Sequence, residues 1–129
     1  MRRTRFNQAD CPIARTVDLL GDWWTPLVLR EFFLGRRRFD ELTGALGISR
    51  AVLSARLKRL EDEGVIERHQ YQERPKRSEY QLTDMGRDLE PVLMSMWNFG
   101  TAHLYRDGER PPSLRMAIAA AAPAPSNDD

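Results

Sequence analysis

Cysteine and histidine are scarce in this sequence: its 129 residues include one cysteine and two histidines. A single cysteine excludes a disulfide within the chain and a zinc site built from several cysteines. It also suits a reducing compartment, so we expect a cytoplasmic protein. His69 and His103 lie far apart, with no metal-ligand spacing between them. We therefore predict neither a metal nor a cofactor.

Long apolar stretches are absent as well. The longest uncharged run that is partly apolar, Pro91–Tyr105, has 15 residues and includes serine, asparagine, threonine and histidine. A helix needs ~20 apolar residues to cross a bilayer, so we expect no membrane partner. The segment Met1–Asp10 is basic and polar and lacks the apolar core of a signal peptide. With 41% hydrophobic and 30% charged residues, the composition is that of one soluble globular domain.

Net charge is nearly absent too, at +1, yet the charges are unevenly distributed. Residues 36–77 carry 11 Arg and Lys against 7 Asp and Glu, whereas residues 78–129 carry 4 against 8. A basic middle segment followed by an acidic end indicates one face directed at a polyanion. The alternative is that these charges only solvate the surface.

The first two predicted helices are marked by their end signals. Pro12 favours a helix that starts there, with Cys11 at or near its N-cap and Gly21 at its end. Asp22 can cap a second helix over Trp23–Leu34. Both segments have apolar residues at helical spacing, which predicts that each packs one face against a core.

A second pair of helices is predicted to lie close together. A short helix is expected over about Phe39–Leu46 and another over about Arg50–Glu63. The turn Gly47-Ile48-Ser49 joins them, and Ser49 is the expected N-cap of the second one. The apolar stripe of that helix consists of Leu53, Leu57 and Leu60.

The hydrophobic period then changes. Residues 65–68 and 78–82 are predicted to be two short strands with a polar hairpin between them. Thr83 is the expected cap of a long final helix that runs to about Arg106. The predicted fold is mainly α with a small β-hairpin wing: a winged helix-turn-helix domain, dimerised through its terminal helices.

The helix over residues 50–63 carries a polar stripe beside its leucines. Arg50, Ser54 and Lys58 lie four residues apart and share one face, while Ala51 and Ala55 are small enough to permit close approach. A helix in the major groove of DNA presents its N-terminal residues and one polar stripe to the base edges. The alternative is a surface helix whose charges only contact water. The predicted DNA contacts of this helix are Ser49, Arg50, Ala51, Ser54, Ala55 and Lys58.

The hairpin and the preceding linker add further cations. Arg74, Lys76 and Arg77 surround the proline at the expected hairpin tip, which predicts contacts with phosphates or the minor groove. Protection of a strand edge by charge is a compatible alternative. Arg36 and Arg38 are further candidates for DNA contact, although they can instead fix the linker.

The final helix has a wide apolar face. Its stripes consist of Met85, Leu89, Val92, Met96, Phe99 and His103, spaced 4, 3, 4, 3 and 4, and of Leu93, Trp97 and Leu104. One small domain does not need so wide a face, so we expect a two-fold interface with a second copy, with the first helix nearby. The alternative is packing on the chain's own core. The predicted interface residues are Leu89, Val92, Met96, Trp97, Phe99 and His103.

Two features suggest that a signal controls the protein. At a helix N-cap, the thiolate of Cys11 would be stabilised by free backbone N–H groups, so Cys11 is a candidate redox sensor. It can equally be a small structural residue. A small-molecule effector pocket near the dimer interface is a second hypothesis, and core packing is its alternative. The aromatic candidates for that pocket are Trp23, Trp24, Phe32, Phe33, Trp97 and Phe99.

Several motifs together resemble the HxlR-type winged helix-turn-helix regulators, which are related to the MarR group. The matching motifs are CP at 11–12, GDWWTPLVLRE at 21–31, GRRRFDEL at 35–42, GISRAVLSARLKRLEDEGVIER at 47–68 and RSEYQLTDMG at 77–86. The resemblance implies a homodimeric transcription factor, most simply a repressor, that binds an inverted repeat in double-stranded DNA. Some relatives with a cysteine at this place sense electrophiles, quinones or peroxides, which implies the same for Cys11.

The resemblance also divides the chain. It covers residues 11–107, in which residues 83–106 are the expected dimerisation helix. Residues 1–10 form a basic arm outside it, and residues 108–129, rich in Gly, Pro, Ala and acid, are expected to be a disordered tail.

Two other classes of protein fit less well. An enzyme with Cys11 as nucleophile lacks a nearby histidine, a Gly-rich phosphate loop and a carboxylate pair, so we predict no catalytic residues. A winged-helix module that only binds proteins is expected to have an uncharged or acidic hairpin and polar stripe. The cations at both places favour DNA.

Overall fold

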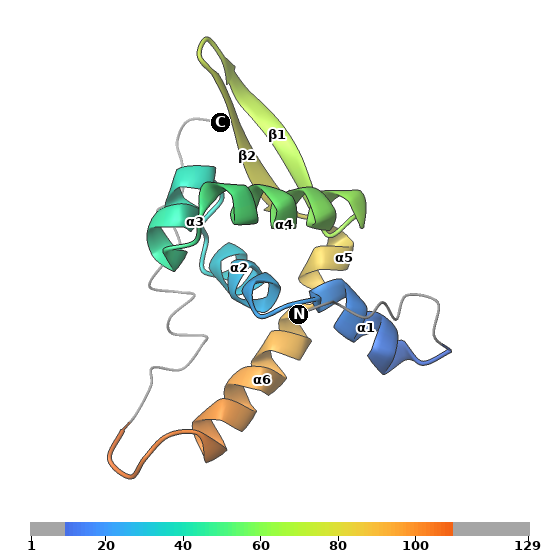
Figure 1. Ribbon diagram of the computed structural model, residues 1–129, viewed down its shortest axis with the longest axis vertical. Coiled ribbons are helices and arrows are strands. Elements are labelled where there is room, and N and C mark those ends of the chain that lie inside the picture. The colour runs from blue at the N-terminus through green and yellow to red at the C-terminus, as the bar shows by residue number, and fades with distance from the viewer. Residues whose placement is uncertain (1–9, 110–129) are drawn as a thin grey trace.

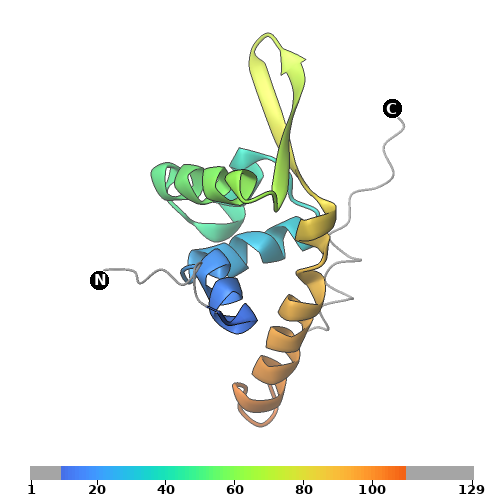
Figure 2. The same cartoon turned by 90° about the vertical axis from the view of Figure 1, so that its right-hand side faces the viewer.

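The computed structural model describes residues 10–109; residues 1–9 of the predicted arm and 110–129 of the predicted tail lie outside the described residues. A body of short helices lies between two projecting elements, the β-hairpin on one side and the last helix on the other (Figures 1 and 2). The elements, in chain order, are α1 (Pro12–Leu20), α2 (Trp24–Phe33), α3 (Phe39–Leu46), α4 (Arg50–Asp62), β1 (Ile66–Glu73), β2 (Lys76–Leu82), α5 (Asp84–Arg87) and α6 (Glu90–His103).

The end signals of the first two helices act as predicted. Cys11 is the N-cap of α1 and Pro12 its first residue, while Gly21, with φ of 70°, ends the helix. Asp22 lies one residue before the N-cap of α2, yet its Oδ1 accepts hydrogen bonds from the backbone N–H groups of Trp24 and Thr25, both at 3.0 Å. It therefore satisfies N–H groups that the helix start leaves without a partner.

Helices α3 and α4 form the helix-turn-helix pair. Gly47 closes α3 in the left-handed conformation, with φ of 64°, a position that favours glycine. Ser49 caps α4, and its side chain accepts a hydrogen bond from Val52 N at 3.2 Å. The predicted leucine stripe of α4 is buried in a core that α2, α3, β1 and α6 also supply. That core consists of Val28, Leu29, Phe32, Leu42, Ile48, Leu53, Leu57, Leu60, Val65, Ile66, Leu89 and Leu93.

The hairpin is longer than predicted. β1 and β2 pair in antiparallel register from Ile66 opposite Leu82 to Glu73 opposite Lys76, with an irregularity between Gln70 and Gln72. The residues beyond 68 are polar and mostly exposed, so they carry no period-2 hydrophobic signal even though their backbones pair. The linker supports the hairpin because Tyr80 N donates to Arg37 O at 2.7 Å.

The single final helix predicted over residues 83–106 is wrong: it is divided into α5 and α6. Proline has no N–H to donate and its ring clashes with the carbonyl group four residues earlier, here that of Arg87, so α5 ends at Arg87 and Pro91 lies in the first turn of a new helix. The predicted cap is correct, since the Thr83 side chain accepts from Gly86 N at 3.1 Å. Only glycine fits at position 86, because a Cβ would overlap the carbonyl oxygen of Val65.

None of the helices within residues 10–109 is long and apolar enough to cross a membrane.

Candidate nucleic-acid interface

The polar stripe of α4 faces solvent. Arg50, Ala51, Ser54, Ala55 and Lys58 are all exposed, while the leucines of the same helix are buried. The small side chains lie between the cations, so the backbone of α4 is accessible along this stripe. An exposed helix face with small and polar side chains fits the major groove of B-DNA.

Arg50 is oriented by its neighbours on α3. One guanidinium nitrogen lies 3.2 Å from Asp40 Oδ1, and its carbon lies 4.5 Å from the centre of the Phe39 ring. Both Arg50 and Asp40 are largely exposed, so the ion pair itself stabilises the fold little. Its consequence is positional, because it holds a cation at the N-terminal end of α4.

Two other polar residues of this face, Lys58 and Ser49, make only local contacts. Lys58 is exposed and lies 3.4 Å from Asp62 in an i,i+4 pair, which a phosphate can replace at small cost because both groups are solvated. The Ser49 hydroxyl already accepts the hydrogen bond that caps α4. It retains its proton as a donor toward DNA.

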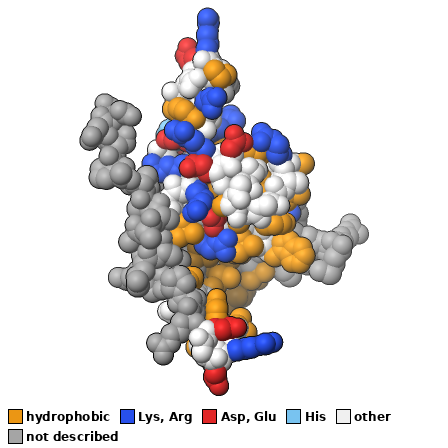
Figure 3. Space-filling view, turned by 90° about the vertical axis from the view of Figure 1, so that its left-hand side faces the viewer, with side chains coloured by type: hydrophobic (Ala, Val, Ile, Leu, Met, Phe, Trp, Pro, Cys, Tyr) orange, Lys and Arg blue, Asp and Glu red, His pale blue; other side chains and the backbone are white. Residues whose placement is uncertain are grey.

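The hairpin projects beyond the helical body and carries cations to its tip. Arg74 and Arg77 are exposed there. Lys76 begins β2, and its side chain lies outside what the structure describes. Figure 3 shows Lys and Arg side chains over the hairpin and the region beneath it. Exposed cations on a projecting element can reach phosphates that the body does not touch.

The two linker arginines already have partners. Arg36 Nε lies 3.3 Å from Oε1 of Glu31, a buried residue whose Oε2 accepts from Arg30 Nε at 2.7 Å. Arg38 Nε lies 3.9 Å from Glu79 Oε2, and its guanidinium carbon lies 4.6 Å from the centre of the Tyr71 ring. These contacts favour the alternative stated for the linker, in which both arginines fix it to α2 and to the hairpin.

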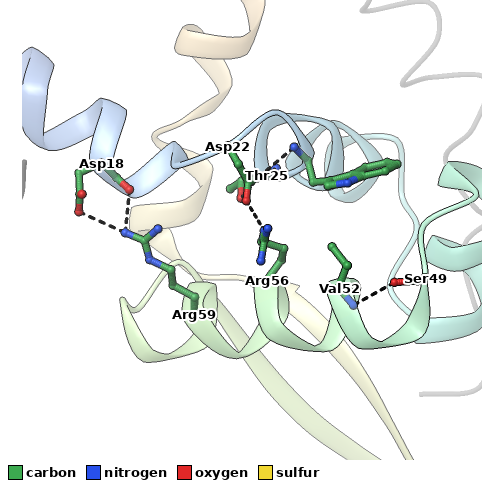
Figure 4. A network of polar contacts seen from close by, with 8 residues as sticks. Asp18, Asp22, Thr25, Ser49, Val52, Arg56 and Arg59 are labelled. Carbon is green, nitrogen blue, oxygen red and sulfur yellow. Dashed lines mark hydrogen bonds and ion pairs between the residues drawn. The ribbon is translucent and has the colours of Figure 1, made fainter. Parts of the chain in front are cut away.

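Two further arginines of α4 lie outside the stripe and form ion pairs with aspartates. Arg56 and Arg59 lie on another face of α4 and pair with Asp22 and Asp18, respectively (Figure 4). Their position off the 50–54–58 stripe is visible in the sequence. Their partners, 34 and 41 residues earlier, are not, because no local pattern links them.

Helices α1 and α6 leave apolar side chains at the surface. Ile13 is 76% and Phe99 62% exposed, and Val17, Met96 and Leu104 are also exposed. Figure 3 shows hydrophobic side chains below the helical body. The Phe99 ring lies 5.0 Å from that of His103, which is exposed as well.

The predicted interface set does not all lie on this surface. Leu89 is only 8% exposed and belongs to the core of its own chain, and Val92 packs against that core. Trp97 is half-buried. The surface available to a second chain therefore begins with Met96 and continues through Phe99 and His103.

The predicted aromatic pocket is only partly assembled. A groove of about 200 Å³ lies between α2 and α6, and of the six aromatic candidates it contains Phe33 and Trp97. Trp23 is 80% exposed outside it, and Phe32 belongs to the core because α2 turns that side inward. The lining residues are Pro26, Leu27, Arg30, Phe33, Leu93, Met96 and Trp97.

Cys11 is exposed at the start of α1, and its side chain makes no capping hydrogen bond. An oxidant can therefore reach the thiol. Across residues 10–109, no group of three or more His, Cys, Asp and Glu side chains could hold a metal ion.

Two helices joined through a glycine turn, then a two-stranded hairpin, define the class of the domain as a winged helix-turn-helix. The family described as HxlR-like helix-turn-helix matches residues 19–108. The chain belongs to this family, as its motifs predicted. It is a transcriptional regulator of the helix-turn-helix type, not an enzyme.

Individual relatives are transcriptional regulators of the same type. An uncharacterized HTH-type transcriptional regulator of Synechocystis, sll1512, is 47% identical over 98 residues, covering 75% of this chain and 73% of that protein. Another, Rv3095 of Mycobacterium tuberculosis, is 42% identical over 103 residues, so 80% of this chain matches only 65% of its length. Among solved structures, the redox regulator HypR in its reduced form has a TM-score of 0.69 and 30% identity, covering 73% of this chain and 94% of HypR.

Proposed function

We propose that the protein is a homodimeric repressor that binds an inverted repeat in double-stranded DNA. The observation that carries this proposal is the stripe of α4, which leaves Arg50, Ser54 and Lys58 exposed on the side away from the leucine core. In each subunit α4 reads base edges in the major groove, and the cations of the hairpin contact phosphates.

The dimer is proposed from the apolar surface of α1 and α6. Exposed residues such as Ile13 and Phe99 are costly in water and typical of protein interfaces. A two-fold arrangement places two copies of α4 about one helical turn of DNA apart, ~34–36 Å. Within this proposal, residues 11–107 are the working unit, and Met96, Phe99 and His103 are its interface on α6.

The test is a titration of the full chain with DNA from upstream of its own gene, against random DNA of equal length. Tighter binding to a specific segment, with two copies of the chain bound per duplex, is expected. Equal affinity for both DNAs, or one copy per duplex, would contradict the proposal. Lys58→Ala should reduce the discrimination, whereas Arg106→Ala, which removes an exposed cation beyond α6, should not.

The signal is proposed to act through Cys11, which is exposed. The likeness to HypR, described as a redox regulator, supports this. Because the sequence has no second cysteine, oxidation to a disulfide must join Cys11 to a small thiol or to Cys11 of the other subunit. A two-electron oxidant such as a quinone or disulfide accepts the electrons, and each thiol that enters the bond loses a proton.

The groove between α2 and α6 favours a second candidate signal, an apolar effector molecule. Its lining is apolar except for Arg30, and it borders Met96 at the proposed dimer interface. A ligand there would alter how α6 meets its partner. Because Trp97 lines the groove, a bound aromatic compound is expected to change tryptophan fluorescence, and Trp97→Phe should abolish that change.

A further inference from the structure

Two polar contacts between distant parts of the chain lie on a face of α4 other than the stripe of Arg50, Ser54 and Lys58. Arg59 Nη2 donates to the backbone oxygen of Asp18 at 2.7 Å and to Asp18 Oδ2 at 3.2 Å. The Asp18 side chain is 6% exposed and that of Arg59 25%. A charge-assisted contact to both main chain and side chain fixes direction as well as distance. The last turn of α1 is thus fastened to the last turn of α4.

A second contact fastens α4 to the start of α2. The two oxygens of the Asp22 carboxylate have different partners. Oδ1 accepts hydrogen bonds from Trp24 N, Thr25 N and Thr25 Oγ1, while Oδ2 pairs with Arg56. Figure 4 shows the two arginines, one helical turn apart, each directed at an aspartate across the gap. One carboxylate therefore links the position of α4 to the first turn of α2.

These two aspartates lie on either side of the bend between α1 and α2. Gly21, at the bend, has φ of 70°. Before the bend, α1 is attached to the core through Leu19 and Leu20, while Ile13 and Val17 are exposed. A second subunit that covers those exposed residues sets the direction of α1. The pair of Arg59 with Asp18 links that direction to α4, and the pair of Arg56 with Asp22 fixes α4 to the bend itself.

We propose that Arg56 and Arg59 are positioning residues that fix α4 to the α1–α2 bend, so that they set the spacing of half-sites that the dimer accepts. This inference rests on the proposed function. Neither arginine lies on the stripe that faces DNA, and neither reads a base. They act by making the two copies of α4 a rigid pair, so that only one separation of half-sites fits both.

The test compares half-site spacing in the full-length protein. The operator is first selected from random DNA with the parent chain. The affinity is then measured for that operator, for versions with one or two base pairs added or removed between the half-sites, and for a single half-site. The variants are Asp18→Asn, Arg59→Gln, Arg56→Gln and Asp18→Asn/Arg59→Gln. Glu63→Gln, which alters an exposed carboxylate at the end of the same helix, is the control.

The parent and Glu63→Gln should prefer the selected spacing by at least about tenfold, since two rigidly linked sites bind together only at matching geometry. The other variants should retain less than about a third of that preference, with the single half-site bound as tightly as by the parent. The double variant removes both charges, so no buried charge is left alone to unfold the protein.

A second readout needs no DNA. Spin labels on Ser54→Cys in a Cys11→Ser background report the distance between the two copies of α4. A narrow distribution is expected in the parent and a broad one in the double variant. Variants that keep the parental spacing preference and a narrow distribution would overturn the inference, even if they melt at a lower temperature. A parent that selects no operator would instead overturn the proposed function.

Discussion

The α3–α4–hairpin region and the pair α1 and α6 leave opposite kinds of side chain at the surface. In the first region apolar residues such as Leu42 and Leu53 are buried, and the exposed side chains are mostly polar or charged, with cations on the α4 stripe and at the hairpin tip. In α1 and α6 the exposed residues include Ile13 and Phe99. A surface rich in exposed cations suits a polyanion, whereas an exposed apolar surface suits another protein.

One small domain thus has two surfaces with different physical properties. Binding at the cationic surface is weakened by salt, because counterions compete for the phosphates. Binding at the apolar surface depends on area removed from water and is nearly indifferent to salt. The contacts of Arg56 and Arg59 with Asp22 and Asp18 connect the two.

The largest effect is expected where the two regions join, at Gly86. Gly86→Ala should lower the free energy of unfolding by about 3 kcal/mol, because the new methyl group overlaps the Val65 carbonyl oxygen. Gly100→Ala is the matched control: it lies within α6 with no atom near the added carbon, so it should raise stability by about 0.5–1 kcal/mol. Urea unfolding measures both. Equal midpoints would show that α5 moves freely against the hairpin.

The next effect breaks the apolar surface alone. Phe99→Asp places a charge where a partner chain is proposed, so it should produce monomers and weaken operator binding about 100-fold or more. Asn98→Asp adds the same charge at the neighbouring exposed position and should leave the dimer intact. Sedimentation gives the mass of each. A folded, tightly binding monomer of the parent would contradict the prediction.

A smaller effect is expected from the hairpin. The triple variant Arg74→Ala/Lys76→Ala/Arg77→Ala should weaken specific and random DNA alike. Each side chain that no longer neutralises a phosphate should reduce the slope of log affinity against log salt by ~0.9. Fluorescence anisotropy over a series of salt concentrations measures the slope, with Arg106→Ala as the control. An unchanged slope would exclude the hairpin from phosphate binding.

Substitutions on the α4 stripe test whether its cations read individual base pairs. Arg50→Ala or Lys58→Ala should reduce the preference for the operator over a single mismatched base pair by ~1–3 kcal/mol, with less effect on random DNA. Arg50 should have the larger effect, because Asp40 and Phe39 orient its guanidinium. If both variants weaken all DNA equally, these side chains contact the backbone.

The smallest effect in the absence of a signal is expected at Cys11. Cys11→Ser should bind DNA like the parent, since the side chain makes no capping hydrogen bond. After treatment with a quinone or a disulfide the parent should lose DNA affinity and recover it with a reductant, while Cys11→Ser should not respond. A parent that is alkylated like free cysteine and ignores the oxidant would leave Cys11 as a structural residue.

Local signals in the sequence determined the helices α1 to α4, the turn between α3 and α4, and the start of α5. Pro12, Gly47, Ser49 and Thr83 each act on backbone groups within four residues, so their effects could be read directly. The stripe of Arg50, Ser54 and Lys58 follows from helical geometry once the helix is correct. The hairpin was predicted, but its predicted strands were too short, because its outer residues have no buried face and therefore show no alternation of apolar and polar residues.

Only the tertiary structure decided which side chains meet across the chain. Leu89 and Phe99 share one stripe in the sequence, yet Leu89 is buried in the core of its own chain and Phe99 is exposed. This difference depends on how the helices pack around α6. The pairing of Arg59 with Asp18 spans 41 residues and follows no local rule. Helix spacing is set by the backbone within one turn, whereas these contacts depend on how whole helices pack. The sequence therefore determined most of the elements and their faces, and the packing decided which faces remain exposed.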